Sequence, residues 1–454
     1  MTRTVLMIAF HFPPYAGSSS VHRTARFAQH LPASGWKTVV LTADRRAYPR
    51  TDWGQYRDAL RAIPVARAFA LDAARHLAIG GRYLRSMALP DRWVSWWPGA
   101  VLTGDALARA HRPSLIWSTY PIATAHLVGL ALHRRTGLPW VAEFRDPMID
   151  GDYPANARVR RLHSWIERRI AARAAALVFT TPSARQAYLA RHSAVVPERC
   201  HVIPNGYDEE DFTGAAAHPT GAAAHPTGAA AHRAGVRPVR LLHAGVIYPQ
   251  ERDPRPFFTA LSMLKHGGRL AAQGLMVDLR APGSDAHYAA VLQGLGIDDV
   301  VRLLPPVPHP AALADCAEAD ALLLMQGPSC NHQIPAKAYE YLRVGRPILA
   351  LTPAEGDTAR LLAETGGSTV VDIDDVDAMG QALPRFLDSV RQGTHPLPDA
   401  GCVRRYERAR QARNLAACFD RLLEGCAAAP VGCAAAPVGC AAAPVGCAAA
   451  PGRS

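Results

Sequence analysis

The chain has 454 residues, 49% of them hydrophobic and 19% charged, which excludes a disordered or collagen-like protein and allows two domains of about 200 residues each. The formal net charge is +12, and residues 1–212 hold the whole excess, with 28 Lys and Arg against 16 Asp and Glu. A basic half of this kind suits an anionic membrane or a phosphorylated ligand as well as nucleic acid, and a solvated surface is the plain alternative.

The N-terminal half alternates short apolar runs with helical ones. A strand at 4–10, a helix at 20–31 and a strand at 37–43 predict a βαβ unit at the start of the chain. Further strands are expected at 115–118, 140–144, 176–179 and 200–203, with helices at 123–135 and 158–175. Such alternation predicts a parallel sheet covered by helices, with ligands at the carboxyl ends of its strands.

The alternation starts afresh in the second half. Strands are expected at 239–244, 275–281, 300–304, 320–325, 347–351 and 368–371, with helices between them. Two low-complexity repeats punctuate the chain, one from Gly214 before this second set of strands and one from Gly425 to the C-terminus. The second repeat has a proline in every copy, so we predict a disordered tail rather than a helix.

Targeting, membrane and metal signals are missing from the sequence. The run at 4–10 lacks a cleavage site, and no run reaches the roughly 18 apolar residues of a spanning helix. The cysteines and histidines show no metal-ligand spacing, and two D-x-D matches, Asp150-Gly-Asp152 and Asp372-Ile-Asp374, lack the strand context of a metal site. We expect a cytoplasmic protein without a catalytic metal.

The segment at 333–351 carries the strongest functional signal. Pro335 suits the first position of a helix, and Lys337 follows in the first turn. The helix dipole disfavours a cation there, unless an anion binds both the lysine and the helix N-terminus. Glu340 lies one turn later on the same face and can accept two hydrogen bonds from a ribose diol, while Lys337 meets a diphosphate. An ordinary amphipathic helix with exposed charges is the alternative.

Two loops after predicted strands are further candidates. Gly17 precedes the first helix together with three serines, where it lets the backbone approach a ligand closely, although a plain turn is the alternative. The strand at 140–144 delivers Glu143, followed by Arg145 and Asp146. A carboxylate here can orient or deprotonate an acceptor hydroxyl, and salt-bridged structural residues are the alternative.

Several segments together resemble glycosyltransferase family 4 of the GT-B superfamily, and more closely its subgroup from bacterial exopolysaccharide and surface-polysaccharide synthesis. They include Phe12-Pro-Pro-Tyr-Ala-Gly, Trp140-Val-Ala-Glu-Phe-Arg-Asp-Pro, Val202-Ile-Pro-Asn-Gly-Tyr-Asp, His243-Ala-Gly-Val-Ile-Tyr and Pro335-Ala-Lys-Ala-Tyr-Glu-Tyr-Leu, in family order. The resemblance implies two Rossmann-like domains facing each other across a cleft. It also implies retaining, metal-independent transfer from a nucleotide sugar, UDP- or GDP-linked, to a saccharide or lipid-linked acceptor.

Domain boundaries follow from the repeats and the resemblance. We expect an N-terminal acceptor-binding domain at 1–205, a linker at 206–236, a C-terminal donor-binding domain at 237–400, a helix at 401–424 and a disordered tail at 425–454. Closure of the two domains around Asn205-Gly206 would exclude water from the cleft.

The resemblance also assigns roles to individual residues. Glu340 would hold the ribose, Lys337 would lie near the diphosphate, and Gly17 would approach the phosphates from across the cleft. Val307 would lie beside the base. Gly245 ends the first C-terminal strand, and Arg252 is the residue left to contact the phosphates.

The sequence departs from the family at the first of its paired glutamates, which is His332 here. The family histidine of the N-terminal domain is also missing, so Glu143 and Asp146 are the catalytic candidates. Two other functions stay open, a non-catalytic nucleotide-binding or partner protein and a nucleotide-sugar epimerase. No stacking motif supports nucleic-acid binding. The basic helix at 158–173 makes peripheral contact with the inner face of the cell membrane an additional hypothesis.

Overall fold

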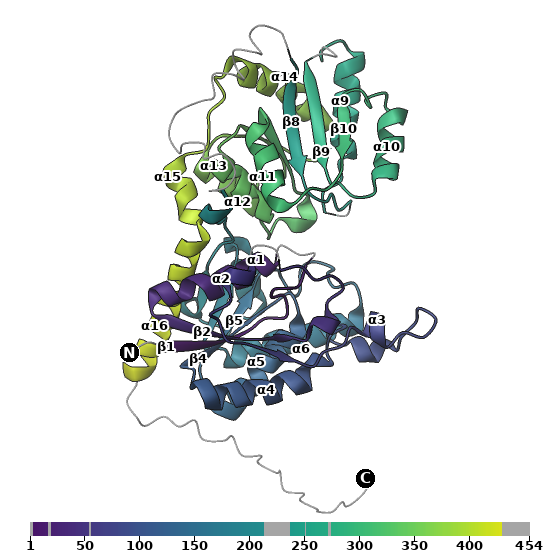
Figure 1. The fold of residues 1–454 in the computed structure, drawn as a ribbon. Helices are drawn as coiled ribbons and strands as arrows, with labels where there is room; N and C mark the ends of the chain where they lie inside the picture. The colour runs from purple at the N-terminus through teal and green to yellow at the C-terminus, as the bar shows by residue number, and fades with distance from the viewer. Residues whose placement is uncertain are drawn as a thin grey trace, which may run out of the picture.

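The computed structural model describes residues 3–16, 20–53, 56–212, 237–249, 251–270 and 274–428. Two parallel α/β units lie one above the other in Figure 1, each a sheet covered by helices on both faces. No helix of these described segments is long and apolar enough to cross a membrane.

The N-terminal unit is built on a seven-stranded parallel sheet of order β3-β2-β1-β4-β5-β6-β7. Its strands are β1 (Arg3–Ile8), β2 (Trp36–Ala43), β3 (Val65–Ala68), β4 (Leu115–Thr119), β5 (Trp140–Phe144), β6 (Ala176–Phe179) and β7 (Cys200–Val202). Its helices are α1 (Ser20–His30), α2 (Tyr56–Ala59), α3 (Ala73–His76), α4 (Trp96–His111), α5 (Ala123–Thr136), α6 (Ala157–Arg173) and α7 (Pro182–Arg191). The strand order reverses between β1 and β4, the point where doubly wound sheets bind ligands.

The C-terminal unit is built on a six-stranded parallel sheet of order β10-β9-β8-β11-β12-β13. Its strands are β8 (Val239–Ala244), β9 (Leu275–Arg280), β10 (Val301–Leu304), β11 (Ala321–Met325), β12 (Ile348–Leu351) and β13 (Ser368–Val371). Its helices are α9 (Arg255–His266), α10 (Asp285–Gly294), α11 (His309–Glu318), α12 (Ala336–Val344), α13 (Asp357–Thr365), α14 (Val376–Gln392) and α15 (Ala400–Val403), followed by α16 (Arg408–Ala428).

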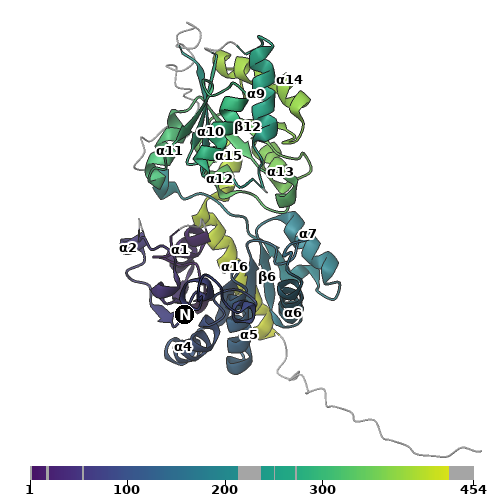
Figure 2. The same ribbon diagram turned by 90° about the vertical axis from the view of Figure 1, so that its right-hand side faces the viewer.

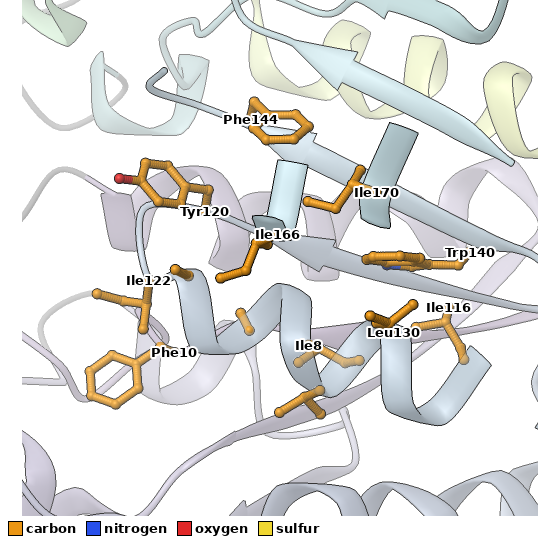
Figure 3. Close-up of a cluster of buried hydrophobic side chains, with 14 of the residues drawn as sticks. Ile8, Phe10, Ile116, Tyr120, Ile122, Leu130, Trp140, Phe144, Ile166 and Ile170 are labelled. Carbon is orange, nitrogen blue, oxygen red and sulfur yellow. The ribbon is translucent and has the colours of Figure 1, made fainter. Parts of the chain in front are cut away.

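Helix α5 packs on the N-terminal sheet through a largely apolar face that also buries Thr124 and His126 (Figure 3). Leu130 of α5 lies in the same buried cluster as Ile116 and Trp140 of the sheet. The indole N–H of Trp140 donates to Ser118, 2.8 Å away, so its polar edge is satisfied inside the core. A Cβ on Gly129 would lie 2.6 Å from the Trp140 ring nitrogen, which explains glycine in the middle of this helix.

Helix α16 leaves the C-terminal unit and returns to the N-terminal one, where it packs beside α1 (Figures 1 and 2). Phe419 of α16 meets the ring of Trp36 edge-on at 5.1 Å between ring centroids. The two chain crossings between the units are hydrogen-bonded to each other, Tyr207 to Tyr406 and Arg408 to Tyr207. The N-terminal unit is therefore completed by the end of the described chain.

The structure confirms the predicted fold class, and every predicted strand forms with its ends shifted by at most two residues. The sequence missed β3, because this edge strand has only four residues and contains Arg67. The helix predicted at 401–424 is instead divided into α15 and α16. The tail prediction was wrong at residues 425–428, which continue α16 because no proline interrupts the helix before Pro430. Residues 213–236, with the first repeat, and 429–454 lie outside the described residues.

Candidate active site

Lys337 lies in the first turn of α12, as expected, with Pro335 as the residue before the helix. Its Nζ is 3.0 Å from Nε2 of His243, at the end of β8. His243 Nδ1 faces the Leu323 carbonyl at 2.9 Å, so this nitrogen donates and Nε2 is left to accept from Lys337. Burial first, and then the lysine charge, hold the pKa of His243 well below its usual value, and the imidazole is neutral.

Arg252 brings a second cation close to Lys337. The Arg252 guanidinium lies over the Tyr248 ring at 5.4 Å and pairs with Glu251 at 3.1 Å, while its Nε has no partner in the described part of the chain. Burial, and then the charge of Arg252, lower the pKa of Lys337 to about 7. Two close cations of this kind create a site that an anion would stabilise.

The backbone beside this cluster comes from the turn at Gly245 and from the start of α12. Gly245, directly after β8, has a φ of +111°, and a Cβ there would lie 3.2 Å from Lys337 Nζ. Helix α12 carries no side-chain cap at its N-terminus, where Pro335 precedes it. Uncapped N–H groups at a helix N-terminus, beside two cations, form the arrangement that binds phosphate.

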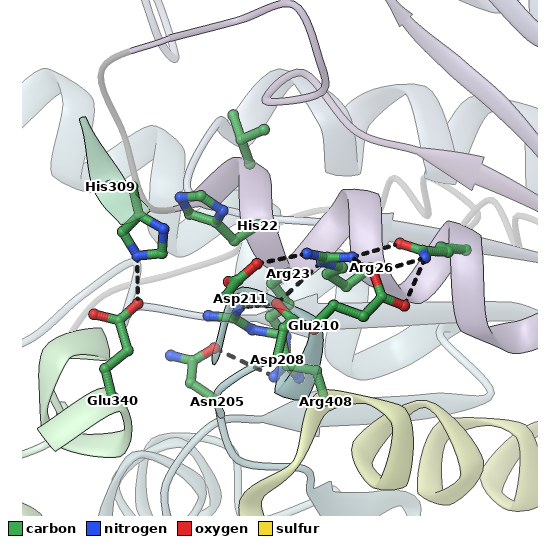
Figure 4. A network of polar contacts seen from close by, with 12 residues as sticks. His22, Arg23, Arg26, Asn205, Asp208, Glu210, Asp211, His309, Glu340 and Arg408 are labelled. Atoms are coloured by element: carbon green, nitrogen blue, oxygen red, sulfur yellow. Dashed lines mark hydrogen bonds and ion pairs between the residues drawn. The ribbon is translucent and has the colours of Figure 1, made fainter. Parts of the chain in front are cut away.

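Glu340, one turn along α12, faces the N-terminal unit (Figure 4). Its Oε1 accepts from His309 Nε2 at 3.1 Å, and the His309 ring lies 5.5 Å from that of His22 in α1. Burial opposes ionisation of Glu340, but the hydrogen bond and charge of His309 outweigh it and lower the carboxyl pKa. The same hydrogen bond raises the pKa of His309, whereas burial lowers that of His22 to about 4. Val307 is half-buried in the loop that leads to His309.

Glu143 is completely buried and both of its oxygens are engaged. Arg23 of α1 pairs with Oε1 at 2.8 Å, and the Thr119 hydroxyl donates to Oε2 at 2.7 Å. The same arginine donates to the carbonyls of Ile203 and Pro204, which lead into the domain connection. The contacts of Glu143 match the salt-bridged alternative, and its catalytic role stays a prediction.

Asp146, three residues further, is half-buried at the carboxyl end of the sheet. Burial raises the pKa of its carboxyl group, with Arg145 opposing this and Glu251 of the other unit adding to it. His11 lies near Arg145 and is buried, with neither ring nitrogen bonded to a described residue. His11, after β1, thus lies at the strand-order switch, and Asp146 follows β5, two strands away from β1 in the sheet. Gly17 lies outside the described residues.

Comparisons with known proteins agree with this geometry. Residues 20–206 match the model of a glycosyl transferase 4-like domain. The fold is similar to a sucrose-phosphate synthase from Thermosynechococcus elongatus, with 15% identity, a TM-score of 0.63, and coverage of 93% of this chain and 100% of that one. It is also similar to HepE from Anabaena in complex with UDP, with 14% identity, a TM-score of 0.60, and coverage of 92% and 100%.

A third similar structure is the lipopolysaccharide outer core galactosyltransferase WaaB, with 12% identity, a TM-score of 0.58, and coverage of 93% and 99%. No curated protein sequence matches the chain. Residues 20–206 are therefore a glycosyl transferase 4-like domain. The chain as a whole has the GT-B fold of these structures.

His332, at the position where the resembling family has its first glutamate, contacts the opposite unit. Its Nε2 is 3.6 Å from Asp150, and its Nδ1 is 2.9 Å from the hydroxyl of Ser183. Ser183 also bonds to Asp357 of the C-terminal unit. Asp150, from one of the two D-x-D matches that lack the context of a metal site, is therefore part of a contact between the two units.

Sequence reasoning missed His22 and His309, and it missed the contacts that His332 makes with the N-terminal unit. His22 and His309 each lie at the start of a helix that follows a strand, which is a weak signal shared with many neutral histidines. Their function depends on contacts between residues 287 positions apart, which only the arrangement of the two domains creates.

Proposed function

We propose that the enzyme transfers a sugar from a nucleoside diphosphate sugar, UDP- or GDP-linked, to a saccharide or lipid-linked acceptor with retention at the anomeric carbon. The observation that carries the proposal is the convergence of Arg252, Lys337 and the uncapped start of α12 beside Glu340. The spacing of Lys337 and Glu340 along α12, with Arg252 beside the lysine, matches a diphosphate followed by a ribose. HepE was solved with UDP and with UDP-glucose, which makes UDP the first nucleotide to test.

The reaction breaks the bond between the anomeric carbon and the β-phosphate oxygen and forms one to the acceptor oxygen. Lys337, Arg252 and the α12 N-terminus stabilise the negative charge that grows on the departing diphosphate. The acceptor hydroxyl attacks from the same face, and its proton passes to the leaving phosphate. Asp146 positions that hydroxyl, while Glu143 holds Arg23 and the domain connection in place.

The acceptor side suggests work on cell-surface polysaccharides at the inner face of the membrane. Helix α6 buries Ile166 and Ile170 and exposes several arginines, and Trp165 on it is 36% exposed with Arg169 over its ring. A basic helix with an exposed tryptophan can rest on anionic lipid headgroups.

The proposal is tested by calorimetry of the purified enzyme with UDP and GDP. Glu340→Gln removes the carboxylate charge that strengthens hydrogen bonds to a ribose diol, so we expect nucleotide affinity to fall about tenfold to a hundredfold. Glu424→Gln, an exposed residue of α16, is the matched control and should bind as the wild type. If no nucleotide binds, or if both variants bind equally, the donor site is wrong.

Turnover separates the proposal from its rivals. Incubation with the bound nucleotide's sugar conjugates should release free nucleotide, faster with an acceptor present. If a different nucleotide sugar forms at the full rate in the absence of acceptor, and the donor is not hydrolysed, the protein is an epimerase. Nucleotide binding without any turnover would indicate a non-catalytic protein.

A further inference from the structure

A pocket of about 420 Å³ lies in the N-terminal unit at the carboxyl edge of its sheet. Arg45 and Arg46 directly follow β2, and Arg75 belongs to α3, after β3. The pocket is also lined by Tyr48, Thr51 and Trp53. Three guanidinium groups line the pocket and no carboxylate does, so it has the charge to attract an anion.

The three arginines differ in how far they are already paired. Arg46 bonds to Asp44 at 3.0 Å, and Arg75 donates to the Tyr48 carbonyl at 2.7 Å. Arg45 is exposed, and neither a hydrogen bond nor an ion pair holds its guanidinium in the described segments. Arg45 is therefore the group with its full hydrogen-bonding capacity available to a ligand.

The pocket is fixed to the loop that leads into the cleft. Tyr15 of the β1 to α1 loop pairs with Thr51, and the carbonyl of Pro14 accepts from the Asp52 amide at 2.7 Å. Tyr15 also stacks on His11, with 4.4 Å between ring centroids. Since neighbouring strands are about 4.8 Å apart, the pocket lies roughly 5–10 Å from the end of β1, which is about the length of one or two sugar rings.

We propose that this pocket binds the phosphate group of a phosphorylated acceptor. The inference rests on the proposed function, because it assumes that the N-terminal unit receives the acceptor. Arginine forks match phosphate oxygens bidentately, and the Trp53 side chain offers a surface against which the attached sugar can pack. The phosphate would anchor the acceptor while its hydroxyl reaches the strand-order switch at the end of β1.

Two probes distinguish the source of the phosphate. The first is glucose 6-phosphate, compared with glucose by calorimetry. The second is binding to phosphatidylcholine vesicles with and without phosphatidic acid. Binding of the sugar phosphate indicates a soluble acceptor, and preferential binding to the phosphatidic acid vesicles indicates a lipid-linked one.

Arg45→Glu should weaken whichever phosphate probe binds by about tenfold or more, because it replaces an attraction by a repulsion. Arg134→Glu makes the same charge change on the exposed surface of α5, and it should alter binding less than twofold. The proposal is overturned if neither phosphate probe is preferred to its neutral counterpart, if Arg45→Glu binds as the wild type, or if both variants weaken binding equally. Binding of UDP to each variant, measured separately, reports on the donor site and keeps a failure there distinct.

Discussion

At the scale of single residues, the properties of Lys337 depend on its neighbours more than on its sequence position. The amino group is buried, faces neutral His243, and lies near the guanidinium of Arg252. These surroundings lower its pKa to about 7, so that it is largely neutral above that pH in the free enzyme. A diphosphate beside it would favour the charged form and raise the pKa again.

Nucleotide binding should therefore take up protons in the range above pH 7. Below a pH of about 7 Lys337 is already protonated, whereas at about pH 8 a bound diphosphate draws about one proton onto it, so affinity falls as pH rises through this window. Calorimetry of UDP binding in buffers with different ionisation enthalpies measures the uptake. Lys337→Met should abolish it and Lys265→Met, on the surface of α9, should not; equal uptake in both variants would contradict the assignment.

At the scale of elements, the connection between the two units depends on one glycine. A Cβ on Gly206 would lie 1.8 Å from the Tyr406 carbonyl oxygen, at the place where the two chain crossings run side by side. Just after it, Asp208 is buried between Arg26 at 3.1 Å and Arg408 (Figure 4). Burial opposes ionisation of Asp208, but Arg408 and its other partners lower the pKa to about 2.

Gly206→Ala should destabilise the enzyme, because the backbone of one crossing must move. Such overpacking costs about 1–3 kcal/mol. Thermal unfolding measures the effect, and Gly380→Ala in α14 is the control, since a Cβ there meets nothing within 4 Å. The control should be neutral or gain up to about 1 kcal/mol from helix propensity. Equal melting temperatures for the two variants would contradict the requirement for glycine at position 206.

At the scale of the whole molecule, polar contacts between the two units stabilise their observed arrangement. They include His332 with Asp150 and Ser183, and Ser183 with Asp357. Partly exposed pairs of this kind are each worth less than about 1 kcal/mol. The equilibrium between open and closed arrangements of the units is therefore only weakly biased by these contacts, and substrate binding can shift it.

Asp150→Asn should shift the enzyme toward an open arrangement, because it removes the charge opposite His332. Energy transfer between fluorophores on α4 and α10 measures the distance between the units. Asp152→Asn, two residues away and exposed, makes the same change without that contact. Donor hydrolysis should rise relative to transfer in Asp150→Asn, as water enters the cleft. Identical energy-transfer efficiencies in the two variants would show that the contact between His332 and Asp150 does not stabilise the arrangement of the units.

The sequence by itself determined the fold class and placed Lys337 and Glu340 on one helix. Apolar runs set both sheets, and Lys337 and Glu340 share a helix face because local periodicity fixes their spacing. Tertiary structure alone decided that α16 completes the N-terminal unit, that Arg23 saturates Glu143, and that His22 meets His309. These contacts join residues that are far apart in the chain. A single sequence shows the local pattern around each residue, but not which distant residues come into contact when the chain folds.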